Sequence, residues 1–279
     1  ATDKPVLIAP AMNVEMWNKP ATKENIKKLH NYNYKFIGPD SGDLACGEVG
    51  EGKMSSINEI EKTLELYFIK KNNSFKNKKV LVTAGPTKEY IDPVRYISNE
   101  SSGKQGYEIA KKLLDAGFDT TLVTGPTNIN YPKELKVIKV ITAEEMLQAC
   151  QKLLPVNIAI CAAAVVDFSP KYKKEKIKKN NSFYHDLKLS ENIDILKFLS
   201  SQNEHRPELV IGFSAETENV LENSLKKLDK KKCDWIIAND VSDKSIGFNS
   251  DNNEITIIYK NKMTEKVSKT SKSEIASEV

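Results

Sequence analysis

Short apolar runs alternate with amphipathic stretches from residue 79 almost to the end of the chain. The amphipathic stretches, at about 104–116, 143–153 and 217–231, have the period of helices. The apolar runs, which predict strands, lie at 79–83, 120–124, 157–162, 208–213, 234–238 and 254–259. Because parallel strands need a crossover between them, this alternation predicts an open, mostly parallel α/β sheet flanked by helices. Ligands of such sheets bind at the carboxyl ends of the strands.

The first part of the chain has a different pattern. Its predicted elements are a strand at 5–9, a helix at 20–31, a short strand at 35–38, a Gly-rich loop at 40–54 and a helix at 57–70. The polar run KKNNSFKNKK that follows is typical of a linker. We therefore predict two domains, 1–72 and 73–279. A buried strand so close to the first residue suggests that the N-terminus is a cut edge.

Composition excludes several classes of protein. Of the 279 residues, 39% are hydrophobic and 29% charged, which is enough for packed cores. A net charge of +4 does not favour general binding to nucleic acid or membranes, but it leaves room for a local anion site. The four cysteines form no CxxC pair, which argues against zinc and disulfides, and no apolar run has the length of a membrane span. We expect a soluble, cytoplasmic protein.

The segment 92–106 is the first candidate site. Small residues such as Ser102 and Gly103 precede a predicted helix, whose free N–H groups and dipole attract anions. Arg95 offers a fork for a carboxylate or phosphate, and Asn99 can polarise a carbonyl. The ordinary alternative is a helix cap made by Ser101 or Ser102. Neither a P-loop nor a GxGxxG pattern is present.

Further candidates follow later strands. Asp167 succeeds a run of small residues and could hold Mg²⁺ on a triphosphate or bond a ribose, unless it merely caps a turn. Six lysines within 171–179, a segment we call the lysine run, suit either a flap over phosphates or a solvated loop. Phe213 could stack on a base, while Lys227 and Lys231 share one helix face.

Upstream, Cys46 lies in a Gly-rich loop and is a candidate acid or nucleophile, although a lone cysteine is most often a small buried side chain.

The order and wording of these segments are more specific than any one of them. GPTKEYIDPVRYISNESSGKQG, AAAVVDF, EKIKK, GFSAET, ANDV and GFNSDNNE follow one another between about residues 79 and 260. This region resembles the synthetase half of the bacterial bifunctional phosphopantothenoylcysteine decarboxylase/phosphopantothenate–cysteine ligases. The upstream PAMNVEMW and ACGEVGEGKM resemble the last two motifs of the decarboxylase half. The resemblance implies a Rossmann-like ligase domain preceded by the C-terminal part of a flavodoxin-like decarboxylase domain.

The resemblance also implies the reaction and its residues. A homodimer, formed through the ligase domain, would join 4′-phosphopantothenate to cysteine through an acyl-cytidylate made from CTP. Asn99 would bond the acyl-cytidylate or the phosphopantothenate, with Arg95 nearby. Asp167 would meet Mg²⁺ on the triphosphate, and Lys176 would lie over the phosphates. The nucleotide site would comprise Cys161, Ala162, Ala163, Asp167, Lys176, Ile193, Asp194, Ile195, Leu196, Phe213, Lys227 and Lys231.

In the decarboxylase half, the resemblance makes Asn13 a ligand of the substrate carboxylate and Cys46 the acid that protonates an enethiolate. The wording departs from the family at SSGKQG, where SSGKMG is expected, and at Lys53, where an arginine is expected. The flavin-binding segment and catalytic histidine would precede PAMN, so we expect this chain to bind FMN poorly. The rival hypotheses are a nucleotide-dependent reductase and a non-catalytic anion-binding protein on a similar fold.

Overall fold

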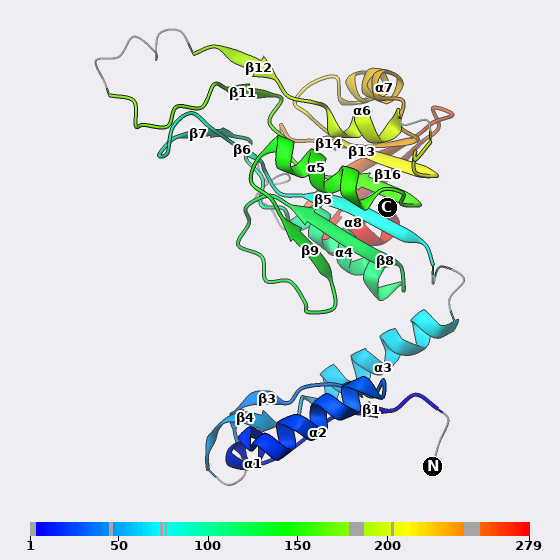
Figure 1. The fold of residues 1–279 in the computed structure, drawn as a ribbon. Helices are drawn as coiled ribbons and strands as arrows, with labels where there is room; N and C mark the ends of the chain where they lie inside the picture. The colour runs from blue at the N-terminus through cyan, green and yellow to red at the C-terminus, as the bar shows by residue number, and fades with distance from the viewer. Residues whose placement is uncertain are drawn as a thin grey trace. The chain divides into compact units, whose positions relative to one another are not determined.

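The structure is a computed structural model that describes residues 4–44, 47–72, 75, 77–178, 187–201, 204–242 and 252–279. The chain divides into two compact units, Ala1–Asn73 and Ser74–Val279 (Figure 1). We describe each unit by itself. Among the described helices, none combines the length and the apolar character needed to cross a membrane.

The described residues of the first unit form two small sheets and three helices. Its elements are β1 (Leu7–Ile8), α1 (Val14–Asn18), α2 (Pro20–Asn31), β2 (Lys35–Phe36), β3 (Asp40–Asp43), β4 (Val49–Lys53) and α3 (Ile57–Asn72). Strands β1 and β2 pair in parallel, whereas β3 and β4 form an antiparallel hairpin. The prediction of a loop over 40–54 is therefore wrong for most of that segment. Its glycines and charged residues hide the strands, because this hairpin buries little apolar surface.

The two motifs of the first unit touch one another. The Met12 N–H donates to the Gly52 carbonyl oxygen at 2.9 Å. Gly52 has a φ of +139°, and a Cβ there would lie 2.1 Å from the Met12 oxygen, so only glycine allows this approach. Trp17 is buried beside them, with its indole N–H donating to Glu51 Oε2 at 3.2 Å.

The second unit is built on an eight-stranded sheet in the order β16-β15-β14-β13-β10-β5-β8-β9. The pairings from β9 to β14 are parallel, and β15 and β16 add antiparallel at one edge. The strands are β5 (Lys79–Ala84), β8 (Asp119–Thr124), β9 (Lys136–Lys139), β10 (Ile158–Cys161), β13 (Leu209–Glu216), β14 (Trp235–Asp240), β15 (Asn252–Tyr259) and β16 (Thr264–Ser271). The predicted open, mostly parallel α/β sheet is confirmed.

Helices cover both faces of this sheet (Figure 1). The helices among the described residues are α4 (Lys104–Asp115), α5 (Ala143–Leu153), α6 (Ile195–Ser200), α7 (Val220–Lys231) and α8 (Lys272–Glu278). In β5, Val80 and Val82 pack in one apolar cluster with Ile109 of α4, while Leu81 packs in another with Met146 of α5. Because side chains alternate along a strand, a strand buried on both faces reads as an unbroken apolar run.

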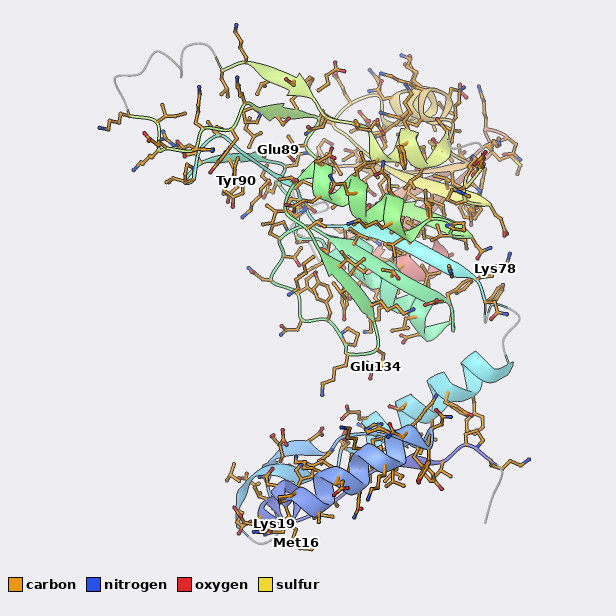
Figure 2. All side chains as sticks on the ribbon, viewed as in Figure 1. Met16, Lys19, Lys78, Glu89, Tyr90 and Glu134 are labelled. Atoms are coloured by element: carbon orange, nitrogen blue, oxygen red, sulfur yellow. The ribbon has the colours of Figure 1, made fainter. Side chains whose placement is uncertain are left out.

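Two short hairpins project together from the sheet (Figure 1). One joins β6 (Lys88–Tyr90) to β7 (Tyr96–Ser98), and the other joins β11 (Phe168–Pro170) to β12 (Leu189–Glu191). Strands β6 and β11 contact each other, and we call the two hairpins the arm. Figure 2 shows Glu89 where the arm begins and Lys78 at the opposite end of β5. The sequence did not predict the arm.

Candidate functional site

Two cavities adjoin at the carboxyl ends of the central strands. The first, of about 440 Å³, lies between the start of α4 and the ends of β10, β13 and β14. The second, of about 520 Å³, lies between the end of β10, α6 and α7. Both are lined by Ala163, Val165, Asp167, Phe213 and Lys227. Strand order reverses between β5 and β10, which is where sheets of this class open a crevice for ligands.

The repeated Gly-Pro-Thr sequence supports the loops of this site. The two copies end the neighbouring strands β5 and β8, and a Cβ on Gly125 would lie 1.6 Å from the Pro86 carbonyl oxygen. Thr87 is fully buried, and its hydroxyl accepts the Val166 N–H at 3.0 Å. Its carbonyl oxygen accepts the Ser98 hydroxyl at 2.7 Å. One turn thus fixes two loops that border the cavities.

The loop after β10 is held along its whole length. The Ala162 N–H donates to the Thr83 oxygen at 3.1 Å, and the Ala164 N–H to the Gly85 oxygen at 2.9 Å. Two side-chain amides hold the next carbonyls: Asn99 Nδ2 donates to the Val165 oxygen at 2.9 Å, and Asn192 Nδ2 to the Val166 oxygen at 2.8 Å. Asp167 therefore follows a loop that is fixed by hydrogen bonds, and its side chain lies at the wall shared by the two cavities.

The start of α4 faces the first cavity. Gly103 is the N-cap, with a φ of +74°, and supplies no side-chain cap. The Ser101 hydroxyl accepts the Gly103 N–H at 3.3 Å, and the Ser102 hydroxyl lies 3.5 Å from the Lys104 nitrogen. The two serines thus bond amides at or before the first helical residue, and neither of them is the N-cap of α4. Gln105 and Gly106 also line the cavity, which gives this helix end the position expected of an anion site.

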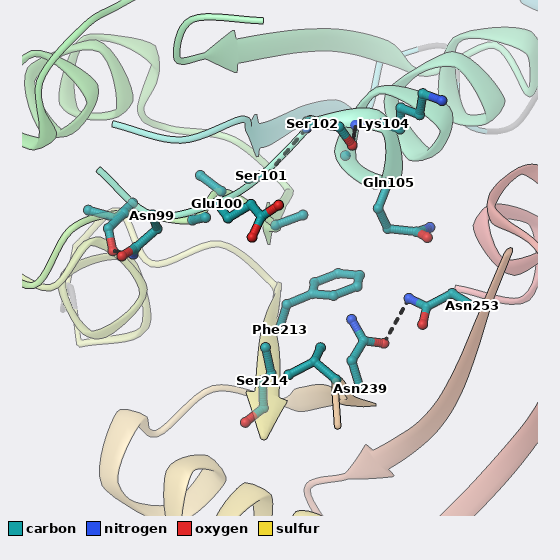
Figure 3. A pocket seen from close by; sticks show the side chains of 18 of the residues that line it. Asn99, Glu100, Ser101, Ser102, Lys104, Gln105, Phe213, Ser214, Asn239 and Asn253 are labelled. Atoms are coloured by element: carbon teal, nitrogen blue, oxygen red, sulfur yellow. Dashed lines mark hydrogen bonds between the residues drawn. The ribbon is translucent and has the colours of Figure 1, made fainter. Parts of the chain in front are cut away.

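The shared wall brings opposite charges together. Lys227 of α7 is partly buried; burial lowers its pKa, and the nearby carboxylates of Glu216 and Asp167 oppose that shift. Phe213 reaches the same wall from β13. Figure 3 shows the Phe213 ring beside Gln105 and Asn239 in the first cavity. A ligand bridging the cavities would meet a carboxylate, an ammonium and an aromatic face.

The second cavity is organised by α6. Asp194 caps this helix by accepting the Lys197 N–H at 2.8 Å, and it forms an ion pair with Lys231. Ile193, Ile195 and Leu196 line the same cavity. Cys161 lines it too, and burial raises the pKa of its thiol, so this side chain contributes a neutral surface and no nucleophile.

Most predicted ligase-site residues fall in the two cavities. The first is lined by Asn99, Ser102, Gly103, Ala162, Ala163, Asp167, Phe213 and Lys227. The second adds Cys161, Ile193, Asp194, Ile195, Leu196 and Lys231. Arg95 and Lys176 lie outside both linings. In the other unit, the Asn13 side chain caps α1 and donates to Glu48 Oε2 at 2.6 Å, and Cys46 lies outside the described residues.

The sequence expectation for Arg95 differs from its place in the structure. Its guanidinium forms an ion pair with Asp92 at 2.8 Å and donates to the Ile177 carbonyl oxygen at 2.7 Å. The Arg95 side chain therefore contacts the backbone of the lysine run at Ile177. Lys176, which precedes Ile177, is exposed.

The sequence prediction missed part of the first cavity. Lys272, only 6% exposed, and the pair Asn239 and Asn253, joined by a 3.1 Å amide hydrogen bond, belong to its lining. Gln105 Nε2 lies 3.4 Å from the Lys272 oxygen. Asn239 follows a predicted strand and lies in the motif ANDV, so the sequence does mark its position. Lys272 begins a helix that the sequence does not predict, so no signal pointed to it.

The described residues contain no group of three or more His, Cys, Asp or Glu side chains that could hold a metal. A single carboxylate such as that of Asp167 is compatible with Mg²⁺, which is usually held by one or two carboxylates together with substrate phosphates.

Comparison with known proteins places the chain in a family. Residues 75–279 match the family described as DNA/pantothenate metabolism flavoprotein C-terminal domain, and residues 1–67 match the flavoprotein family. The coenzyme A biosynthesis bifunctional protein CoaBC of Haemophilus influenzae is 41% identical over 100% of this chain and 69% of its own length. That of Borreliella burgdorferi is 42% identical over 100% of this chain and 70% of its own length.

Solved structures agree with these relatives. A crystal structure of the C-terminal domain of a CoaBC protein matches 72% of this chain and 91% of its own, with 37% identity and a TM-score of 0.60. The DNA/pantothenate metabolism flavoprotein from Streptococcus pneumoniae matches 72% of this chain and 95% of its own, with 26% identity and a TM-score of 0.60. The chain therefore belongs to the family of bifunctional coenzyme A biosynthesis enzymes, as its sequence motifs predict.

Proposed function

We propose that residues 75–279 join 4′-phosphopantothenate to L-cysteine, with CTP as the activating nucleotide. The observation that carries the proposal is the pair of adjoining cavities that share Asp167, Phe213 and Lys227. A ligation of this kind must bring the α-phosphate of a nucleotide against the carboxylate of a second substrate. Two cavities with a common charged wall suit that requirement.

Each substrate has a cavity that fits its chemistry. CTP would occupy the second cavity, with its base against Phe213 and its phosphates near Lys227. Phosphopantothenate would occupy the first, with its phosphate at the start of α4 and its carboxylate at the shared wall. The polar side chains of Asn239 and Asn253 line the space between those ends and can bond the hydroxyl and amide groups of the pantothenate.

The reaction would proceed in two displacements. A carboxylate oxygen of phosphopantothenate attacks the α-phosphorus of CTP, and pyrophosphate leaves with the electron pair of the broken P–O bond. The amine of cysteine then attacks the acyl carbon, CMP leaves and the amine loses a proton. Negative charge grows at the α-phosphate in the first step, and the ammonium group of Lys227 would stabilise it. Mg²⁺ bound to the triphosphate and to Asp167 would supply further positive charge.

Two further residues have proposed roles. Asn99 can present its amide to the acyl group while its Nδ2 stays bonded to the Val165 oxygen, because an amide nitrogen carries two donors. Lys176 would add charge over the phosphates, as the family resemblance implies. Its exposed position leaves its side chain room to reach a bound nucleotide.

The other activity belongs to the longer protein. In the bifunctional parent, FMN would support decarboxylation of the ligation product, with Asn13 on the substrate carboxylate and Cys46 as the acid. The contact of Met12 with Gly52 brings the two motifs that carry these residues into one small unit.

We also propose that the ligase domain forms a homodimer through the arm. Val94, Tyr96 and Phe168 are 57%, 44% and 45% exposed on or beside its short strands. Exposed apolar side chains that gather on one surface are typical of interaction sites. The substitution Val94→Asp should shift a dimer toward monomer in light scattering coupled to size-exclusion chromatography. An unchanged mass would contradict this interface.

Thermal shift with CTP, ATP, NADPH and FMN in parallel, each with Mg²⁺, tests the nucleotide assignment. We expect the largest stabilisation with CTP, because only a ligand that binds the folded state raises the melting temperature. A dominant shift with NADPH would instead support a reductase. Equal shifts with any polyanion would support a non-catalytic anion-binding protein.

A further inference from the structure

Asp92 has a charged side chain that lines neither cavity. It lies in the turn between β6 and β7, and its side chain is 0% exposed. One carboxylate oxygen accepts the Val94 and Arg95 N–H groups, each at 2.9 Å. The other accepts the Ile177 N–H at 3.2 Å and forms the 2.8 Å ion pair with Arg95. A buried carboxylate with this many donors is fixed in one orientation.

One of these contacts, that with the Ile177 N–H, reaches the lysine run, which lies more than eighty residues further along the chain. Arg95 and Asp92 together hold both backbone polar groups of Ile177, because Arg95 donates to its carbonyl oxygen at 2.7 Å. At the other end of the described part of the run, the Lys173 N–H donates to the Ile91 oxygen at 2.9 Å. The run is therefore tied to one turn at two points.

The burial pattern along the run agrees with this anchoring. Ile177 is buried, whereas Lys173, Lys174 and Lys176 are exposed. A segment so rich in lysine repels itself and gains little from burying apolar surface, so an external anchor decides where its charges lie. The Asp92–Arg95 pair supplies that anchor.

We propose that Asp92 is a positioning residue for the ligation: through Arg95 and the backbone of Ile177 it sets where Lys176 meets the nucleotide phosphates. The proposal rests on the proposed function for its catalytic part, and it assigns Arg95 to positioning in place of direct ligand binding. The anchor itself can be tested without any substrate.

The test compares Asp92→Asn with Glu89→Gln. Glu89 is also a buried carboxylate of the same hairpin, but it accepts the Ala143 N–H at 2.8 Å, at the start of α5 and not in the lysine run. The first readout is the rate at which trypsin cuts after Lys176 in the folded, ligand-free protein. Losing a buried charged hydrogen bond should raise this rate about tenfold or more in Asp92→Asn. Glu89→Gln should cut there at the wild-type rate.

The second readout is kcat/KM for CTP, which we expect to fall about tenfold or more in Asp92→Asn and to change little in Glu89→Gln. An unchanged trypsin rate would overturn the anchor. A faster rate with unchanged kcat/KM would overturn the positioning role while leaving the ligase assignment intact. If even the wild-type chain released no pyrophosphate, the proposed function would fail, and the trypsin rates would still decide the anchor.

A second variant covers the case in which Asp92→Asn does not fold, as judged by near-UV circular dichroism. Arg95→Lys keeps the charge beside Asp92 but lacks the planar fork that bonds Asp92 and Ile177 together. For Arg95→Lys we expect a smaller rise in the trypsin rate and a smaller fall in kcat/KM for CTP. If neither changed, the proposal would be overturned in the same way.

Discussion

The side-chain amide of Asn99 donates to the carbonyl oxygen of Val165 at 2.9 Å, joining the loop before α4 to the loop after β10. These two loops come from opposite sides of the point where strand order reverses. The bond therefore spans the crevice in which both substrates would bind, and it gives Asn99 a structural partner as well as a proposed ligand.

Asn99→Asp should impair the conversion of substrates while the fold and CTP binding persist. A carboxylate would face the Val165 oxygen and the developing negative charge, and it would repel both. Quenched-flow mass analysis would show the acyl-cytidylate either failing to form or accumulating unused. Asn223→Asp is the matched control, because Asn223 Nδ2 also donates to a backbone oxygen, that of Glu218 at 3.0 Å, away from the cavities. Wild-type turnover of Asn99→Asp would remove this residue from the site.

Lys176→Gln should slow the ligation, because it removes one positive charge that would lie close to the phosphates. We expect a loss of ~2–4 kcal/mol of transition-state stabilisation, as for other single electrostatic donors. Lys173→Gln should cost much less, because the family resemblance implies that Lys176, and not Lys173, lies over the phosphates. Steady-state kcat/KM for CTP measures both. Equal losses at the two positions would support a solvated loop that acts only through its summed charge.

Lys227 should take up protons when the nucleotide binds. Burial lowers its pKa in the free protein, so part of the population is neutral at alkaline pH below the ordinary value of 10.5. Bound phosphates favour the charged form and raise the pKa again. Calorimetric titration in two buffers of different ionisation enthalpy would reveal this uptake, and Lys227→Gln should abolish it. Lys226→Gln, on the same helix but outside both cavities, is the control. A proton count unchanged by Lys227→Gln would refute the assignment.

Phe213→Leu should weaken CTP binding while the fold is kept. Stacking of a base on an aromatic ring contributes ~1–3 kcal/mol, so KM for CTP should rise about tenfold. Phe213→Tyr retains the ring and should restore most of the affinity. If leucine and tyrosine behave alike, the ring does not stack on the base.

Asp92 should also shape the acid stability of the second unit. Burial alone would raise its pKa, but the three backbone N–H donors and the Arg95 guanidinium outweigh burial and lower it from 3.8 to about 2. Its contribution to the free energy of unfolding is thus complete above pH 3.8 and is lost as the pH falls toward about 2. Urea unfolding across this range should show a shallower pH dependence for Asp92→Asn than for wild type. Parallel curves would contradict the role of this carboxylate.

The main sheet could be predicted because its strands are buried on both faces. The predicted runs 79–83 and 208–213 contain the unbroken apolar stretches 80–82 and 209–211, and the helices between the strands have a clear amphipathic period. The arm could not be predicted, since its strands have three residues each and mix polar with apolar side chains in no regular pattern. β16 was missed for a similar reason: Thr264–Ser271 is an edge strand rich in lysine and threonine.

The candidate site divides in the same way. Residues near strand ends, such as Asp167 and Phe213, could be predicted because topology alone brings those ends together. The position of Arg95 could not be predicted, because its partner Ile177 is distant in the sequence and comes close only in the folded protein. Lys272 likewise reaches the first cavity only through the packing of α8 against α4.

Pyrophosphate release is the measurement that tests the central claim most directly. With CTP, Mg²⁺ and 4′-phosphopantothenate, the account predicts a burst of pyrophosphate matched by acyl-cytidylate, and continuous release with CMP and phosphopantothenoylcysteine once cysteine is added. Release that needs no phosphopantothenate, or no release with all three substrates present, would contradict it.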